Sequence, residues 1–193
     1  MELVETFEDP EAYYVVTKFM PAGSMHNYLK KQKNHYLTET HVKKLVIQVA
    51  LGIQEIHSHN IVHRDIKLEN LLMTDFSEDA QVRIADFGSA FRLNSREDFS
   101  IFRIGTPGYT APELLLKKPY RFGIDIWALG VLMHVLMTMK MPFWNNDQKK
   151  RNKQICFEPL IISETLHQAY SEDAIDLMTS MLIKEPEDRP TID

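Results

Sequence analysis

Four polar residues between positions 65 and 86 have the types that phosphoryl transfer requires. The carboxylate of Asp65 can orient an attacking hydroxyl and take its proton, and the ammonium of Lys67 can steady the moving phosphoryl group. Asn70 and Asp86 offer hard oxygen atoms, which are the ligands that Mg²⁺ prefers. An aspartate that only caps a turn is the alternative interpretation of Asp65. We expect the four side chains to converge on one cleft floor.

Short motifs around these residues resemble the signature set of the protein kinase family. Residues 63–70 read HRDIKLEN and residues 86–88 read DFG; either motif alone is weak, but both in this order match the set. The further matches are GTPGYTAPE at 105–113, DIWALG at 125–130 and RPT at 189–191. The resemblance covers nearly the whole chain in unbroken order. It implies a protein-kinase-like fold, α+β overall, of which this chain is the mainly α-helical C-terminal lobe with a few short β-strands.

The resemblance implies an ATP- and Mg²⁺-dependent protein serine/threonine kinase. Lys67 stands where kinases of this type have lysine, and Thr106 matches the threonine that hydrogen-bonds the catalytic aspartate and lysine. Asp86 is implied to hold the magnesium that bridges the phosphates, and Asn70 the second metal position. Glu69 matches an acidic position that some members use for a basic substrate residue, and it equally fits a solvated turn residue.

Residues 17–20 resemble the hinge, the segment that binds adenine in this family. By this resemblance Thr17 is the gatekeeper, and the backbone of Lys18 and Met20 hydrogen-bonds the adenine edge. Leu72 is implied to pack beneath the adenine ring. An ordinary edge strand is the alternative interpretation of this segment.

Part of the family's nucleotide site is missing from the printed sequence. None of its seven glycines forms a G-x-G-x-x-G, and no V-A-I-K-like lysine precedes the hinge. We therefore expect residues 1–20 to be the last two strands of the small lobe plus the hinge. Residues 21–193 are expected to be the C-terminal lobe, truncated at its final helix. A fragment that is inactive alone is our interpretation; natural truncation and an incomplete gene model are the alternatives.

Hydrophobic patterning predicts the elements that position these residues. Apolar residues recur at intervals of three and four from Thr38 to His57, which indicates a long amphipathic helix. The apolar run from Ile124 to Met139 contains Asp125 and His134, which favours a buried helix over a membrane span. We also expect a hairpin of residues 3–7 and 13–17, a helix from Ser24 to about Lys33, strands at 61–62, 71–73 and 82–84, and helices near 112–116, 147–154 and 172–182.

Several residues are expected to support the site rather than to react. By resemblance, the His63 ring packs beneath Phe87, and Asp125 anchors the backbone around His63. Glu113 and Arg189 are predicted to form a buried ion pair that braces the substrate-binding loop.

The expected activation loop departs from the common family pattern. Phe102 stands where many members carry a phosphorylatable threonine, so that Arg64 lacks its usual phosphate partner. We hypothesise activation without phosphorylation at that position, with Glu97, Asp98 or no residue serving Arg64. Ser100 is the nearest substitute acceptor.

Composition limits the classes of partner and compartment. The net charge of −5 gives no reason to expect nucleic acid or membrane as a partner. The single cysteine, Cys156, excludes an internal disulfide and fits a reducing, cytoplasmic compartment. The expected partners are a protein substrate and ATP. Residues 105–113 and 141–144 (MPFW) resemble most the calcium/calmodulin-dependent kinase group, whose regulatory segment would lie beyond Asp193. A non-catalytic, protein-binding scaffold is the second hypothesis.

Overall fold

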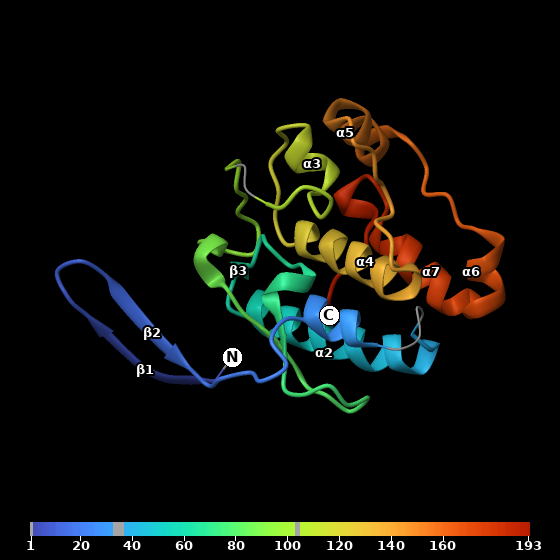
Figure 1. Ribbon diagram of the computed structural model, residues 1–193. Helices are drawn as coiled ribbons and strands as arrows, with labels where there is room; N and C mark the ends of the chain where they lie inside the picture. Colours follow the sequence, from blue (N-terminus) through green and yellow to red (C-terminus); the bar gives the residue numbers. More distant parts are fainter. Residues whose placement is uncertain (1, 33–36, 103–104) are drawn as a thin grey trace.

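The computed structural model describes residues 2–32, 37–102 and 105–193. The described part is a mainly helical lobe with three two-stranded antiparallel sheets. Helices occupy the body of the lobe, and the first sheet projects from it as an arm (Figure 1). This mixture of helices and short strands confirms the predicted fold class.

The arm is the predicted hairpin, in which β1 (Leu3–Glu8) pairs with β2 (Tyr13–Thr17). Asp9 closes the turn, since one of its carboxylate oxygens accepts the amides of Glu11 and Ala12, each at 2.8 Å. Every residue of β1 is exposed, so the hairpin stands largely outside the core. The second strand, β2, leads into residues 17–20, which are the predicted hinge.

Two long helices form the core beneath the site. α2 (Glu39–Ser58) begins after its N-cap Thr38 and buries the apolar face that the sequence predicts. α4 (Gly123–Thr138) is buried at every position from Ile124 to Met137, as its uniformly apolar sequence predicts. Gly130 lets α7 (Glu172–Met181) approach, because a Cβ there would lie 2.8 Å from the Cβ of Met181. Within the described ranges, none of the helices combines the length and apolarity that crossing a bilayer requires.

Short strands hold the two loops that carry the predicted reactive residues. β3 (Ile61–Val62) pairs with β6 (Phe91–Arg92), and β4 (Leu71–Met73) pairs with β5 (Val82–Ile84). The loop 63–70 therefore leaves β3 and enters β4, while the loop 85–90 leaves β5 and enters β6. This arrangement brings both loops to the same edge of the lobe. β6 was not predicted from the sequence.

The other helices surround this centre. α1 (Met25–Lys31) begins after the predicted cap Ser24, whose side chain accepts the Asn27 amide. It ends before the predicted Lys33, which lies outside the described residues. The helix α6 (Glu164–Ala169) was not predicted from the sequence, and α5 (Gln148–Phe157) extends past its predicted end at Gln154. The remaining bounds are α3 (Pro112–Leu115), α5 (Gln148–Phe157) and α6 (Glu164–Ala169), with single 3-10 turns at Leu68–Asn70, Phe87–Ser89 and Pro186–Asp188.

Candidate active site

A buried carboxylate on α4 fixes the start of the loop 63–70. Asp125 is 1% exposed, and its two oxygens accept the backbone amides of His63 (2.8 Å) and Arg64 (2.9 Å). The ring Nε2 of His57 lies 2.9 Å from the same carboxylate. The predicted anchoring by Asp125 is confirmed. This anchor also holds Arg64 at a φ of 69°, a left-handed conformation that a non-glycine residue rarely adopts.

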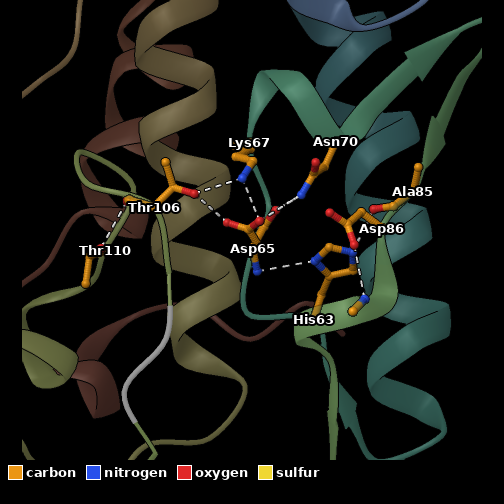
Figure 2. Close-up of polar contacts among 9 residues, drawn as sticks. His63, Asp65, Lys67, Asn70, Ala85, Asp86, Thr106 and Thr110 are labelled. Carbon is orange, nitrogen blue, oxygen red and sulfur yellow. Dashed lines mark hydrogen bonds and ion pairs between the residues drawn. The ribbon is translucent and has the colours of Figure 1, made fainter.

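Three of the predicted residues, two of them from this loop, surround the carboxylate of Asp65 (Figure 2). Lys67 Nζ donates to Asp65 Oδ2 at 2.6 Å, and Asn70 Nδ2 donates to the same oxygen at 2.9 Å. Thr106 comes from a distant segment, and its hydroxyl donates to Asp65 Oδ1 at 2.7 Å. Lys67 Nζ also donates to Thr106 Oγ1 at 2.9 Å, which closes a ring of contacts. The structure therefore brings Asp65, Lys67, Asn70 and Thr106 together as predicted.

The surroundings of Asp65 keep it ionised. Burial alone would raise the pKa of this carboxyl, but hydrogen bonds from Lys67, Thr106 and Asn70 and the Lys67 charge hold the pKa below its usual value. Its side chain is 12% exposed, so that it remains open to a ligand on one side. An ionised carboxylate beside an ammonium can orient a hydroxyl group and accept its proton.

Asp86 lies at the start of the second loop, 85–90, close to this cluster. Its backbone is left-handed (φ 61°, ψ 78°), and one carboxylate oxygen accepts the Gly88 amide at 3.1 Å. Figure 2 shows its side chain next to that of Asn70. The amide nitrogen of Asn70 donates to Asp65, so the oxygen Oδ1 is the atom that Asn70 can offer to a cation. An amide oxygen and a carboxylate at one edge form a donor set that fits Mg²⁺.

The ring of His63 supports the second loop, as predicted. It is fully buried, and it lies edge-on to Phe87 with ring centroids 5.0 Å apart. Its Nε2 lies 3.2 Å from the carbonyl oxygen of Ala85, so the imidazole links the two loops (Figure 2). These contacts assign His63 a structural role.

The segment from Thr17 to Met20 connects the hairpin to the lobe. The Lys18 amide donates to the Glu2 carbonyl (3.0 Å), and the Met20 carbonyl accepts the Gly23 amide (2.9 Å). Leu72 pairs with Ser24 in an isolated β-bridge just after this segment, so that it lies near the hinge. Among the described residues 18–20, no hydrogen bond is found to the Lys18 carbonyl, to either backbone group of Phe19 or to the Met20 amide. Binding of adenine by these groups stays a prediction.

The partners of Arg64 differ from those that the sequence suggested. Its guanidinium donates to the Ser89 carbonyl (2.5 Å) and to the Tyr120 hydroxyl (3.0 Å), and it lies over the Phe91 ring. Of the alternatives that the sequence left open, neither acidic residue serves Arg64: Asp98 binds Asn94 and the Phe99 amide, and Glu97 binds Ser95. The sequence missed Tyr120 because it lies 56 positions from Arg64 and reads as an ordinary core residue.

Tyr120 connects Arg64 to the segment 100–102. Its hydroxyl donates to the Phe102 carbonyl at 2.6 Å, and its backbone exchanges two 2.9 Å hydrogen bonds with Ser100. Ser100 is only 3% exposed, so it is poorly placed to be a substitute phosphate acceptor. The loop is thus held by a neutral tyrosine rather than by an acidic residue.

The predicted pair of Glu113 and Arg189 is confirmed as buried and bidentate. The two N···O distances are 2.7 and 2.8 Å, and the side chains are 1% and 0% exposed. Arg189 also donates to three carbonyl oxygens, of Ile183, Gly123 and Lys184. This pair fixes α3, and hence the end of the segment 105–113, against the core. Glu69, by contrast, is half exposed and lies 3.4 Å from His26 Nδ1.

Comparison with known proteins agrees with this geometry. The family model described as "Protein kinase domain" matches residues 1–193. The chain is 33% identical to serine/threonine-protein kinase PLK4 of Nematostella vectensis over all of its own length and 19% of the relative's. It is 33% identical to calcium/calmodulin-dependent protein kinase type II of Caenorhabditis elegans, over all of its length and 26% of the relative's.

A third relative, serine/threonine-protein kinase Nek3 of Mus musculus, is 34% identical over 97% of the chain and 35% of its own length. The chain therefore spans between 19% and 35% of the length of these three relatives. Their identities are nearly equal although their names differ, so the similarity does not single out the calcium/calmodulin-dependent group.

Proposed function

The chain belongs to the protein kinase domain family, and on that premise we propose that the protein containing it is a serine/threonine kinase that phosphorylates protein substrates with ATP. The observation that carries the proposal is the contact of one carboxylate, Asp65, with Lys67, Asn70 and Thr106. Such a cluster has little use in a purely structural loop, because it concentrates polar groups at a partly open edge. The names of two of these relatives, PLK4 and Nek3, support serine and threonine as acceptors.

Each residue has a proposed role in the transfer. Asp65 orients the substrate hydroxyl and accepts its proton, while Lys67 stabilises charge on the transferred group. Thr106 is a positioning residue, since its hydroxyl holds both of these side chains. Asn70 and Asp86 would hold Mg²⁺, which when bound neutralises charge on the phosphates.

The proposed adenine site lies at the end of the hairpin. The Lys18 carbonyl can accept from the amino group of adenine, and the Met20 amide can donate to a ring nitrogen. Thr17 leaves space behind the ring as a small side chain, and Leu72 supplies an apolar surface beneath it. Within the family, the motifs at 105–113 and 141–144 favour the calcium/calmodulin-dependent group, whose regulatory segment would be a further partner. We propose a cytoplasmic protein.

A phosphorylation assay tests the proposed function. The intact protein is incubated with ATP, Mg²⁺ and peptides that contain serine, threonine or tyrosine, and products are identified by mass spectrometry. We expect phosphoserine and phosphothreonine. The 193-residue chain alone is expected to give little product, because it contains no glycine-rich loop to cover the phosphates. The absence of any phosphopeptide from the intact protein would favour the scaffold hypothesis, and phosphotyrosine alone would contradict the acceptor class.

We further propose that Tyr120 orders the segment 100–102 without a phosphate. Tyr120→Phe removes the hydroxyl that joins Arg64 to the Phe102 carbonyl. Two net hydrogen bonds are together worth about 1–3 kcal/mol, so we expect deuterium uptake by residues 99–102 to become roughly tenfold faster. Hydrogen-exchange mass spectrometry of the chain measures this change.

Tyr170→Phe is the matched control for that experiment. The Tyr170 hydroxyl is also buried and bonds to the carbonyl oxygens of Leu37 and Met137, at 2.6 and 3.2 Å. Loss of the Tyr170 hydroxyl should destabilise the lobe without a selective increase in deuterium uptake at residues 99–102. Equal acceleration in both variants, or none in Tyr120→Phe, would refute the role of Tyr120.

A further inference from the structure

Lys184 lies just after α7, and its ammonium group lies against two aromatic rings. Its Nζ is 3.7 Å from the ring centroid of Phe143 and 5.2 Å from that of Trp127. The two rings stack on each other, with their centroids 5.9 Å apart. Nζ also donates a hydrogen bond to the backbone carbonyl of Gln154 on α5, at 3.3 Å. Lys184 is partly exposed, so a small solute can reach it.

The charge of this lysine is not balanced by an acid. Among the described residues, no carboxylate lies within ion-pair distance of Lys184 Nζ, and the nearby Glu158 lies 3.8 Å from Lys153 instead. A second cation is close, because the Arg189 guanidinium lies 5.1 Å from the Trp127 centroid and donates to the Lys184 carbonyl at 2.9 Å. A lysine that is desolvated or beside another cation is an activated nucleophile.

These surroundings favour the neutral amine over the ammonium. Burial lowers the pKa of Lys184 to about 8, and the Arg189 charge acts in the same direction. The Cys156 thiol on α5 and the Glu158 carboxylate raise this pKa, but they do not offset the burial. The aromatic rings attract the ammonium, yet they also exclude water from it. Near pH 7.5, about a quarter of such an amine is neutral, against about a thousandth of an ordinary lysine.

Two residues in contact with Lys184 each have a buried polar atom without a partner among the described residues. These atoms are the indole Nε1 of Trp127 and the side-chain Oε1 of Gln154. The indole N–H needs an acceptor, and the amide oxygen needs a donor. Leaving such atoms unpaired in the interior is unfavourable. An amide formed on Lys184 would carry a carbonyl oxygen and an N–H, which are the two groups that these atoms lack.

We propose that Lys184 is a modification site, acylated at Nζ by small acyl phosphates without a second enzyme. The lone pair of the neutral amine attacks the acyl carbon, so that a C–N bond forms and the C–O bond to phosphate breaks. Inorganic phosphate leaves and takes up the proton that the amine loses. The product is uncharged, so the reaction removes a positive charge beside Arg189, whose pair with Glu113 fixes α3.

Reaction of the folded 193-residue chain with acetyl phosphate tests this inference. Peptide mass spectrometry measures the rate at each lysine, and the exposed Lys149 and Lys150 are the internal controls. Near pH 7.5 we expect Lys184 to react roughly tenfold faster than either control, because its larger neutral fraction outweighs the lower nucleophilicity of a weaker base. Its rate should level off above about pH 8, while the control rates keep rising. In guanidinium chloride the three rates should become equal.

Two variants of the buried Cys156 test the electrostatic cause. Cys156→Asp places a carboxylate near Lys184, which favours the ammonium, and should slow acetylation of Lys184 roughly tenfold. Cys156→Asn has the same shape without the charge and should leave that rate within about threefold of the wild type.

Equal rates at Lys184 and the two exposed lysines in the folded wild-type chain would overturn the proposal. A preference for Lys184 that persists in guanidinium chloride, or equal slowing by the two Cys156 variants, would also overturn it. The wild-type comparison decides the matter even if Cys156→Asp does not fold. None of these measurements needs ATP, so their outcome is independent of the proposed kinase activity.

Discussion

Asp65→Asn lowers the rate of phosphoryl transfer by the intact protein at least a hundredfold. Asparagine keeps the shape of the side chain but has one acceptor oxygen, so it can keep the hydrogen bond from Lys67 or the one from Thr106, and it cannot take a proton from the substrate hydroxyl. General-base catalysis typically contributes ~10²–10⁴ in rate. The loss of the carboxylate charge also leaves Lys67 without its ion partner. The steady-state rate of phosphopeptide formation at saturating ATP measures the effect.

Asp75→Asn makes the same chemical change in an exposed loop and serves as its control. The Asp75 carboxylate accepts the Ser77 amide at 2.8 Å and lies on the segment between β4 and β5. Its rate should stay within about twofold of the wild type, because the change removes one surface charge far from the reaction. If Asp65→Asn retains more than a tenth of the wild-type rate while both variants melt like the wild type, Asp65 is not the base.

Glu113→Ala destabilises the lobe by ~3–5 kcal/mol, the largest effect on stability that we expect from a single change. Arg189 would stay buried and charged, and its three bonds to carbonyl oxygens would not replace the lost bidentate carboxylate. Chemical unfolding followed by circular dichroism measures the free energy of unfolding.

Two further variants separate burial from charge in that experiment. Glu185→Ala breaks the exposed pair with Lys118, whose N···O distance is 3.5 Å, and should cost at most about 1 kcal/mol. Glu113→Leu/Arg189→Met replaces both buried charges by apolar groups and should recover most of the loss, because no charge is then stranded. A Glu113→Ala protein within 1 kcal/mol of the wild type would show that the pair does not brace the lobe.

The local parts of the fold could be predicted because short-range rules determine them. Thr38 caps α2, and the repeat of apolar residues at three and four selects its buried face. Asp65, Lys67 and Asn70 converge because all three lie in one short loop between the strands β3 and β4. The role of Thr106 and the pair of Glu113 with Arg189 came from the resemblance rather than from spacing, since these contacts join distant segments.

What the sequence did not reveal depends on the path of long loops or on very short elements. The contact of Arg64 with Tyr120 needs the segment 100–102 to return to the lobe, and no periodic pattern encodes that path. The strand Phe91–Arg92 exists only through its pairing with Ile61–Val62. The helix Glu164–Ala169 is too short to show an apolar stripe.

The attachment of the loop 63–70 to Asp125 has a consequence for how activity responds to heat. Because both oxygens of one buried carboxylate hold this loop, its geometry shares the cooperative melting of the core helix α4. The exposed hairpin, by comparison, can fray early without disturbing the loop. Warming of this chain should therefore disorder the hairpin, and with it the predicted adenine site, well before it disorganises the loop 63–70.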